Sequence, residues 1–479
     1  MSKGRLAQWG VLGVTLLAAA LRLYQMGVKS FWWDECFTYV ITATLPPSIA
    51  WHAMIEDANK PPLYYLMMQP WVALSGTSEY AFRFPSAALG LLSVPVIYHL
   101  GRVLGGQAVG MLAALLLAVC PFHIWYSQDA RMYVPMTCFS LVAMDRFVMS
   151  LRGQPRWAAF TLSSGLAYLM HYASASLIYV QLGWMLPRLR QTGLIRRWFL
   201  AQAVALALLA PWLFVVYGVR NLRPTGLGWI PFPGLLAPLA SLWNWVTADV
   251  ETVTLPVIVL MAGVALVFLR GLFPWNEERR LLVWWLALPI GFLFLLSLRR
   301  PYYVDRYLMA SLPAFILLLS FGITAWRRAA LRLAAAAVVL AAMTWGTTRL
   351  YADSLFFKED WRGVATAVEE GLGAGDVVLM QDQETFIGTS AYATRQWPYV
   401  VMSQEASLTI ESATAGYKRV WLVWRSPYEY NHRLSKSDRF DILALATPPV
   451  RAWLVAHRGQ VALDLRLPGL SLVRIDREG

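Results

Sequence analysis

The chain has 479 residues, of which 58% are hydrophobic and only 14% are charged, and it carries 23 Trp. A soluble domain of this length would show more charge on its surface, which excludes an ordinary globular enzyme. Several separate apolar runs reach the length of about 20 residues that crosses a bilayer. The composition therefore predicts a polytopic α-helical membrane protein.

The first apolar run, 11–23, follows the short basic start MSKGR. A cleaved signal peptide would look similar, but the loop after it carries the motifs described below, and the loop charges need this span. We therefore expect a retained helix. In all we expect about eleven transmembrane spans, near residues 7–24, 84–101, 107–125, 133–150, 157–171, 173–187, 199–218, 253–270, 281–298, 306–326 and 331–348.

Arginines gather in every second predicted loop. These loops hold Arg102, Arg152, Arg156, Arg188, Arg190, Arg196, Arg197, Arg270, Arg279, Arg280, Arg327, Arg328 and Arg332. Because positive loop charge marks the cytoplasmic side, the pattern places the N-terminus inside and the loops 25–83 and 219–252 outside. The net charge of +13 is explained by this topology and requires no nucleic acid.

The composition changes after Leu350. Residues 351–479 are charged throughout and have no apolar run long enough to span. KEDWRGVATAVEEGL reads as an amphipathic helix, and VVLMQD, KRVWLVWR, QVALDLRL and SLVRIDR read as strands. We therefore expect a membrane domain at 1–350 and an extracytoplasmic α/β domain at 351–479.

Ionisable residues on the predicted outer side fall in aromatic surroundings. They are Asp34 and Glu35 in KSFWWDECFTYV, Lys60 in NKPPLYY, Arg83 in FRFPSA, Asp129 and Arg131 in WYSQDARMY, and Arg299, Arg300, Asp305 and Arg306 in RRPYYVDRYLMASLPAF. Charges at membrane depth are costly, so they are usually paired or used for substrate.

Carboxylates together with several cations fit the transfer of a group from a lipid-linked phosphate. A carboxylate can take the proton of an acceptor hydroxyl, and Lys or Arg can stabilise the charge that develops on the leaving phosphate. Plainer interpretations stay open. Asp34 and Glu35 can cap a surface helix, Lys60 can anchor the interface, and Asp129 and Arg131 can form a structural pair.

Taken in order, WWDE, KPPLYY, FRFPSA, SQDARMY and DRYLMASLPAF resemble the membrane-embedded GT-C glycosyltransferases. The chain is similar to bacterial relatives of the protein O-mannosyltransferases and to the lipid A aminoarabinose transferase. The likeness covers roughly residues 1–350, and KEDWRGVA resembles the start of the C-terminal domain in bacterial members.

The resemblance implies a role for each outer residue. Asp34 is the expected general base, and Glu35 orients the acceptor or Asp34. Asp129 is a second catalytic loop carboxylate, which positions the acceptor or holds Arg131. The residues expected at the donor phosphate or in supporting ion pairs are Lys60, Arg83, Arg131, Arg300 and Arg306. The expected substrate-lining residues are Tyr64, Tyr133 and Tyr303.

The resemblance also implies a polyprenyl-phosphate sugar donor, inversion at the anomeric carbon, and a glycan, lipid or protein acceptor. It implies no required cofactor. A divalent metal stays open, because His123, His171 and Asp129 fall near the outer ends of spans.

Two other functions stay open at this point. The first is a transporter or flippase of an anionic lipid-linked substrate, although transporters place ionisable groups near the midplane and the middles of these spans are nearly free of charge. The second is a structural membrane scaffold, which leaves the first-loop motif unexplained.

Overall fold

The computed structural model describes residues 3–57, 60–188, 190–219, 230–248, 254–352, 358–402, 409–425 and 448–477. The chain divides into two compact units. The first, which we call the membrane unit, comprises Met1–Met26, Pro47–Trp71 and Arg83–Ala352. The second, which we call the sheet unit, comprises Gly27–Pro46, Val72–Phe82 and Asp353–Gly479. The first predicted outer loop is therefore divided, and its WWDE motif belongs to the sheet unit.

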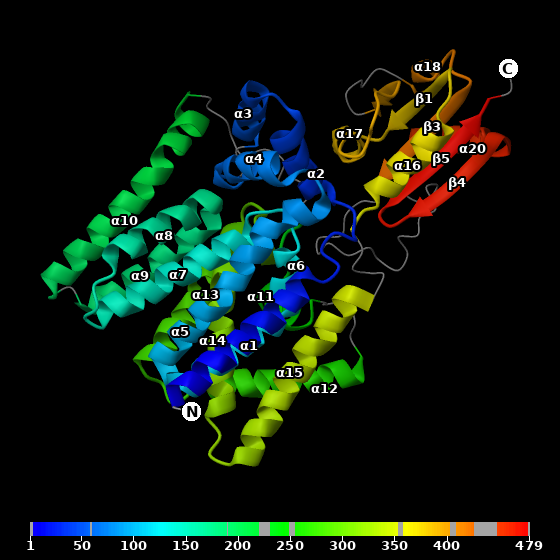
Figure 1. Ribbon diagram of the computed structural model, residues 1–479. Helices are drawn as coiled ribbons and strands as arrows, with labels where there is room; N and C mark the ends of the chain where they lie inside the picture. Colours follow the sequence, from blue (N-terminus) through cyan, green and yellow to red (C-terminus); the bar gives the residue numbers. More distant parts are fainter. Residues whose placement is uncertain are drawn as a thin grey trace. The chain divides into compact units, whose positions relative to one another are not determined.

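Helices make up the membrane unit (Figure 1). They are α1 (Lys3–Leu23), α3 (Pro47–Glu56), α4 (Leu63–Ser75), α5 (Glu79–Val119), α6 (Pro121–Ser127), α7 (Tyr133–Leu151), α8 (Trp157–Met170), α9 (Leu177–Met185), α10 (Thr192–Leu213), α11 (Ala237–Thr247), α12 (Leu255–Gly271), α13 (Glu277–Ser297), α14 (Leu312–Thr324) and α15 (Ala329–Ala352). The end of α4, at 72–75, and the start of α5, at 79–82, belong to the sheet unit. Short 3₁₀ or π turns extend some of them: η2 (Tyr172–Ser176), η3 (Leu186–Arg188), η4 (Phe214–Val219) and η5 (Asp305–Ser311).

In the part of the chain that the structure describes, seven helical segments are long and apolar enough to cross a membrane, and α12 is a shorter apolar helix. Every predicted span coincides with helix, but α8 and α9 have only 14 and 9 residues. The polytopic helical class is confirmed, and the number of eleven crossings stays a prediction. Part of the second predicted outer loop, at 220–229 and 249–252, lies outside the described residues.

Helix α5 contains two of the predicted spans. The backbone leaves the helical region at Gly106, whose φ of 86° favours glycine. A Cβ on Gly101 would lie 2.8 Å from the Cα of Gly110, so the two arms of α5 meet there. Nine residues of straight helix would hold these positions about 13 Å apart. The chain therefore reverses direction at Gly106, as a hairpin between two spans requires.

Helix α14 is the buried centre of the membrane unit. Residues Leu312 to Ile323 are all buried, and α14 packs against α7, α12, α13 and α15. Backbone atoms of α12 and α14 come into direct contact where Gly271 faces Leu318 and Gly322 faces Val267. Small residues allow such a close approach. In a bilayer the hydrophobic effect does not drive helices together, so close packing at small residues holds them instead.

The sheet unit has five strands in the order β2-β1-β3-β5-β4. They are β1 (Asp376–Met380), β2 (Tyr399–Val401), β3 (Arg419–Arg425), β4 (Val461–Leu467) and β5 (Leu470–Asp476). Strand β1 pairs in parallel with β2 and β3, while β5 pairs antiparallel with β3 and β4. The predicted strands are confirmed, and β2, of three residues, is the strand that the sequence pattern did not indicate.

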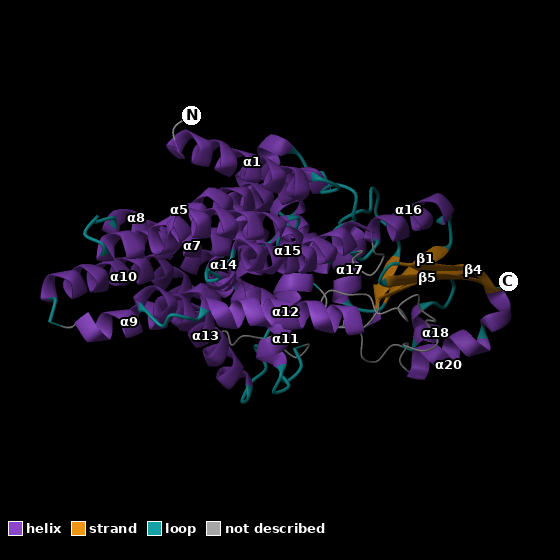
Figure 2. Cartoon of the chain, turned by 90° about the horizontal axis from the view of Figure 1, so that it is seen from below, coloured by secondary structure: helices purple, strands orange, loops and turns teal. Residues whose placement is uncertain are grey.

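Helices cover both faces of this sheet (Figure 2). Helices α18 (Ile410–Ala413) and α20 (Pro448–Ala456) cover one face, where Leu422 and Trp453 belong to the buried core. Helices α16 (Trp361–Gly371) and α17 (Gln383–Ser390) lie on the other face. Because β1 is covered on both sides, all five of its residues are buried.

The sheet unit also contains a short helix from near the start of the chain. Helix α2 (Trp33–Tyr39) runs directly into the π turn η1 (Val40–Thr44). It packs against α17, which follows it by more than three hundred residues in the sequence. The motif WWDE therefore opens a helix that is part of the sheet unit.

We predict that Gly322→Ala destabilises the membrane unit. The new Cβ would lie far inside van der Waals contact with the carbonyl oxygen of Val267, so α12 and α14 must separate. Overpacking of this kind costs about 1–3 kcal/mol. The midpoint of thermal unfolding in detergent should fall, whereas Gly13→Ala, whose Cβ meets nothing within 4 Å, should leave it unchanged. Equal midpoints for the two variants would contradict the packing described here.

Candidate functional site

The motif WWDE forms the first turn of α2. Trp32 is the residue before the helix, and the Glu35 Oε2 accepts a hydrogen bond from its backbone N–H at 3.3 Å. This contact satisfies one of the donors that a helix start leaves without an intrahelical partner. Both Asp34 and Glu35 lie where the helix dipole favours negative charge.

The two adjacent acids have different surroundings. Glu35 is fully buried, and its Oε2 forms an ion pair with the Nζ of Lys358 at 2.9 Å. Asp34 is 7% exposed. Neighbouring residues on a helix point about 100° apart, so the two carboxylates face different directions.

Lys60 lies in a half-buried network of the membrane unit. Its Nζ forms an ion pair with Asp57 Oδ2 at 2.8 Å. The hydroxyl of Tyr65 donates to the same carboxylate oxygen at 3.3 Å. Arg131 in turn donates to the hydroxyl of Tyr65 at 3.1 Å. The lysine and the arginine are therefore joined through one tyrosine and one carboxylate.

A second network surrounds Arg306. Its Nε donates to the hydroxyl of Tyr133 at 3.0 Å, and its guanidinium lies over the rings of Tyr133 and Tyr307. The imidazole of His171 contacts both of these rings. Arg306 is buried, and stacking on aromatic faces suits a guanidinium in such a place.

The two networks meet at His171. The charges of Lys60, Arg131 and Arg306 all act on its imidazole. These three cations come from the segment before α4, the segment before α7 and η5, so distant parts of the sequence converge here. We call the six residues Lys60, Tyr65, Arg131, Tyr133, His171 and Arg306 the cation–tyrosine cluster.

Two further predicted residues border this cluster. Asp129 is 1% exposed, and both Asp129 and Arg306 act electrostatically on Tyr126. Tyr303 shares a hydrogen bond of 3.0 Å with Ser241, which donates to Asp305 at 2.6 Å. Burial raises the pKa of the Tyr303 phenol well above its usual range, so this hydroxyl stays protonated.

The remaining predicted residues have other surroundings. Arg83 is buried and donates to the backbone carbonyl of Met26 at 2.7 Å. Tyr64 shares a hydrogen bond of 3.2 Å with Ser86. Arg300 is exposed after α13, and no side-chain contact is found for it within the described residues. The roles of Arg83 and Arg300 at a donor phosphate, and of Tyr64 in lining the substrate site, stay predictions.

Several residues that complete these networks were not singled out from the sequence. Asp57 was detectable, because it precedes Lys60 by three residues, a spacing typical of ion pairs. Tyr65 and Lys358 lie in the segments KPPLYY and KEDWRGVA, but the sequence does not indicate which residues they contact. The contacts of Tyr65 with Arg131 and of Lys358 with Glu35 span 66 and 323 residues of sequence, so spacing gives no signal for them.

The two histidines considered for a divalent metal have other contacts in the structure. Within the described ranges no group of three His, Cys, Asp or Glu residues could hold a metal ion. The Nδ1 of His123 lies 2.9 Å from a nitrogen of Arg22, and the Nδ1 of His171 accepts from the backbone N–H of Ala173 at 3.1 Å.

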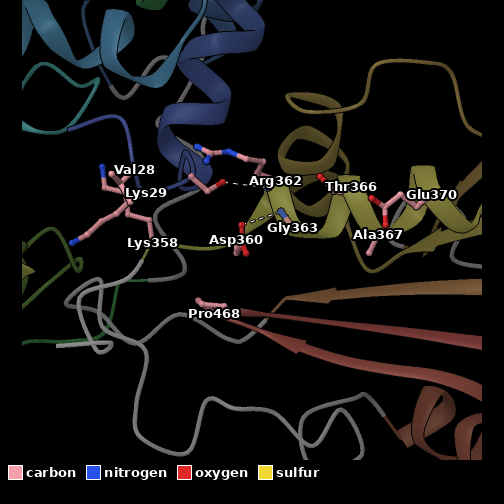
Figure 3. A pocket seen from close by; sticks show the side chains of 11 residues that line it. Val28, Lys29, Lys358, Asp360, Arg362, Gly363, Thr366, Ala367, Glu370 and Pro468 are labelled. Carbon is pink, nitrogen blue, oxygen red and sulfur yellow. Dashed lines mark hydrogen bonds between the residues drawn. The ribbon is translucent and has the colours of Figure 1, made fainter. Parts of the chain in front are cut away.

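A cleft of about 460 Å³ opens on the sheet unit beside Lys358 (Figure 3). Its lining combines Lys29, Lys358 and Arg362 with the carboxylates of Asp360 and Glu370. The cleft thus adjoins the segment that pairs with Glu35.

Comparison with known proteins adds an independent observation. The family model described as dolichyl-phosphate-mannose-protein mannosyltransferase matches residues 59–215. No curated protein sequence matches the chain. The crystal structure of ArnT from Cupriavidus metallidurans in the apo state is similar over 98% of both chains, with 13% identity and a TM-score of 0.62. The chain has the GT-C fold.

Two liganded structures share this fold. One is ArnT from Cupriavidus metallidurans bound to undecaprenyl phosphate, with a TM-score of 0.59 and 14% identity over 99% of this chain and 98% of that one. The other is the oligosaccharyltransferase AglB from Archaeoglobus fulgidus in complex with an inhibitory peptide and a dolichol-phosphate. Its TM-score is 0.53, with 13% identity over 88% of this chain and 69% of that one.

The segment matched by the family model includes much of the candidate site. Residues 59–215 contain Lys60, Tyr65, Arg131, Tyr133 and His171, five of the six members of the cation–tyrosine cluster. Helix α2 and the sheet unit lie mostly outside this match. The family model therefore does not test the resemblance of the KEDW segment to bacterial GT-C members.

We predict that Tyr133→Phe destabilises the membrane unit. The change removes the hydroxyl that accepts from the Nε of buried Arg306, and a buried donor without its acceptor costs about 1–3 kcal/mol. Thermal unfolding in detergent should show a lower midpoint. Tyr179→Phe removes a hydroxyl from a 46% exposed ring on α9 and should leave the midpoint unchanged. A midpoint for Tyr133→Phe no lower than that of this control would refute the expectation.

Proposed function

We propose that this chain is a glycosyltransferase that moves a sugar from a polyprenyl-phosphate donor to an acceptor hydroxyl. The observation that carries the proposal is a set of cations held among tyrosines in the membrane unit. Lys60 and Arg131 are joined through Asp57 and Tyr65. Arg306 donates to Tyr133, whose ring contacts His171. Ammonium and guanidinium groups with neighbouring hydroxyls suit a phosphate. Aromatic rings suit the adjoining isoprenoid and sugar.

The shared fold supports the same donor class. ArnT binds undecaprenyl phosphate and AglB was solved with a dolichol-phosphate, and both lipids are polyprenyl phosphates. Arginine-rich alternate loops in the sequence support an extracytoplasmic reaction, because they assign the motif loops to the outer side. We propose that the acceptor is a glycan, a lipid or a protein on that side.

In the proposed reaction Asp34 is the general base. Its carboxylate takes the proton of the acceptor hydroxyl while the acceptor oxygen forms a bond to the anomeric carbon. The bond between the anomeric carbon and the phosphate oxygen breaks, and its electron pair stays on the departing polyprenyl phosphate. A single displacement of this kind inverts the anomeric centre.

The cation–tyrosine cluster acts on the leaving group in this proposal. Negative charge grows on the phosphate as the bond breaks, and preorganised cations stabilise charge that develops in the transition state. A water-poor, apolar setting strengthens this attraction. The Tyr133 hydroxyl, which accepts from Arg306, helps to hold the guanidinium in position.

We predict that Asp34→Asn lowers kcat by a factor of roughly 10² to 10⁴, the usual contribution of a general base. Donor binding should be retained, because the phosphate ligands are elsewhere. Purified protein is incubated with a panel of radiolabelled polyprenyl-phosphate sugars and a membrane extract as acceptor source. Transfer and donor binding are measured for wild type and variant.

Each other outcome has a definite meaning. Equal turnover by both proteins removes Asp34 from the reaction but keeps the enzyme. If no sugar is consumed and labelled lipid instead crosses a bilayer containing the protein, the chain is a flippase and the proposed reaction is wrong.

We predict that Arg306→Met weakens binding of undecaprenyl phosphate at least tenfold. The change removes a buried cation beside Tyr133 and His171, and a hydrogen bond to a charged group contributes about 1.5–3 kcal/mol. Binding is measured by microscale thermophoresis with detergent-solubilised protein. Arg332→Met, on the exposed side of α15, should bind as wild type does. A loss of affinity equal in both variants would point to a general charge effect.

A further inference from the structure

We propose that the KEDW segment, residues 358–361, is a positioning device that holds α2 and so orients Asp34. In this proposal Glu35 is an anchor of α2 and does not take part in proton transfer. The inference rests on the proposed function, because it assigns a task around the base of that reaction. It gives the sheet unit a role in catalysis.

Lys358 provides the first contact. Its ammonium pairs with Glu35 at 2.9 Å, and the two side chains are only 4% and 0% exposed. An ion pair removed from water holds its geometry tightly, because the loss of either partner leaves a buried charge uncompensated. The pair with Lys358 therefore sets the direction of Glu35, and with it the rotation of α2 about its axis.

Glu359 provides the second contact. Its Oε2 accepts from the backbone N–H of Trp33 and from the indole of Trp361, both at 2.8 Å. Trp33 is the first residue of α2, where backbone N–H groups have no partner inside the helix. A carboxylate more than three hundred residues away in the sequence thus caps this helix start, where negative charge is favoured.

Arg425 on β3 fixes the carboxylate that makes this cap. Its Nε donates to Glu359 Oε1 at 2.5 Å, and it forms a second ion pair with Glu384 on α17. Its guanidinium also lies over the ring of Trp33. The start of α2 is therefore connected to the central strand of the sheet through Glu359 and its ion pair with Arg425.

The other half of the segment attaches it to the sheet unit. Asp360 caps α16 by accepting from the Gly363 N–H at 2.9 Å, as drawn in Figure 3. The backbone N–H of Asp360 donates to the carbonyl of Pro468, between β4 and β5. Trp361 is fully buried. Lys358 and Glu359 thus reach α2 while Asp360 and Trp361 secure the segment.

A further contact holds the chain just before α2. The hydroxyl of Tyr392 accepts from the Phe31 N–H at 2.7 Å and donates to Glu79 at 2.7 Å. Burial raises the pKa of Tyr392 well above its usual range, and the neighbouring Cys36 and Glu79 act in the same direction. This phenol therefore remains protonated and keeps both contacts.

These contacts explain why two adjacent acids occur in one motif. Glu35 is held by Lys358, and Asp34 projects from α2 in another direction. A misplacement of about 1 Å can cost a factor of 10² in rate. The contacts of Glu35 and Glu359 would therefore act on the reaction through the placement of Asp34.

The test is a double-mutant cycle with Glu359→Gln and Asp34→Asn in the full-length protein. If Glu359 acts through Asp34, Glu359→Gln lowers kcat about 10- to 100-fold with the KM for the donor unchanged. In the Asp34→Asn background the same change should then lower the residual rate less than twofold. A slowing by the same factor in both backgrounds would mean a general structural role and overturn the proposal.

Three companion variants sharpen the result. Lys358→Arg keeps the ion pair and should retain kcat within about threefold. Lys358→Met removes the ion pair and should lower kcat as much as Glu359→Gln does. Asp464→Asn removes a carboxylate from an exposed ion pair on β4 and should leave kcat unchanged. A wild-type rate for Glu359→Gln and Lys358→Met would overturn the proposal.

Hydrogen exchange separates this inference from the proposed function. Backbone amides of α2 should exchange faster in Glu359→Gln than in wild type, whether or not sugar is transferred. If Glu359→Gln exchanges faster but the wild type transfers no sugar, the anchor exists and positions no base. That result overturns both this proposal and the proposed function. Unchanged exchange in an active enzyme would overturn the anchor alone.

Discussion

A charge that is taken out of water needs a partner, and this chain meets the requirement across long stretches of sequence. Glu35 and Lys358 are paired and nearly inaccessible, and Glu359 is held by Arg425 in the same unit. In the membrane unit, Arg306 and Arg131 contact tyrosine hydroxyls and rings. Because solitary buried charges are so unfavourable, these few contacts determine where α2 lies and how the cation–tyrosine cluster is arranged.

Much of the fold was predictable from local pattern. Apolar runs longer than about 18 residues indicate helices at membrane depth whatever their neighbours are, and the break between two such runs coincides with the reversal at Gly106. Strands β1 and β3 were visible as short apolar runs bounded by turn residues. Strand β2 was not, because three residues carry no period. The membership of α2 in the sheet unit depends on pairs such as Trp33 with Glu359, and no local pattern reports them.

The residues of the candidate site could be named from the sequence, whereas most of their contacts could not. Asp34, Lys60, Arg131 and Arg306 were singled out because ionisable groups among aromatics are unusual in an apolar chain. The partner of Lys60 is three residues away, but the partner of Arg306 is 173 residues away. The guanidinium of Arg83 donates to the backbone carbonyl of Met26, a contact that no sequence pattern indicates, and its role at a donor phosphate stays a prediction.

The sheet unit is assembled from chain segments that are made at very different times. Glu35 leaves the ribosome 323 residues before Lys358, which at about 5–20 residues per second is a delay of roughly 15 to 65 s. Throughout that interval α2 lacks both its cap and its counter-ion, while the helices of the membrane unit are being inserted. The sheet unit therefore closes only after the last span is complete. An unfinished or truncated chain would carry the expected base on a helix that lacks these two contacts.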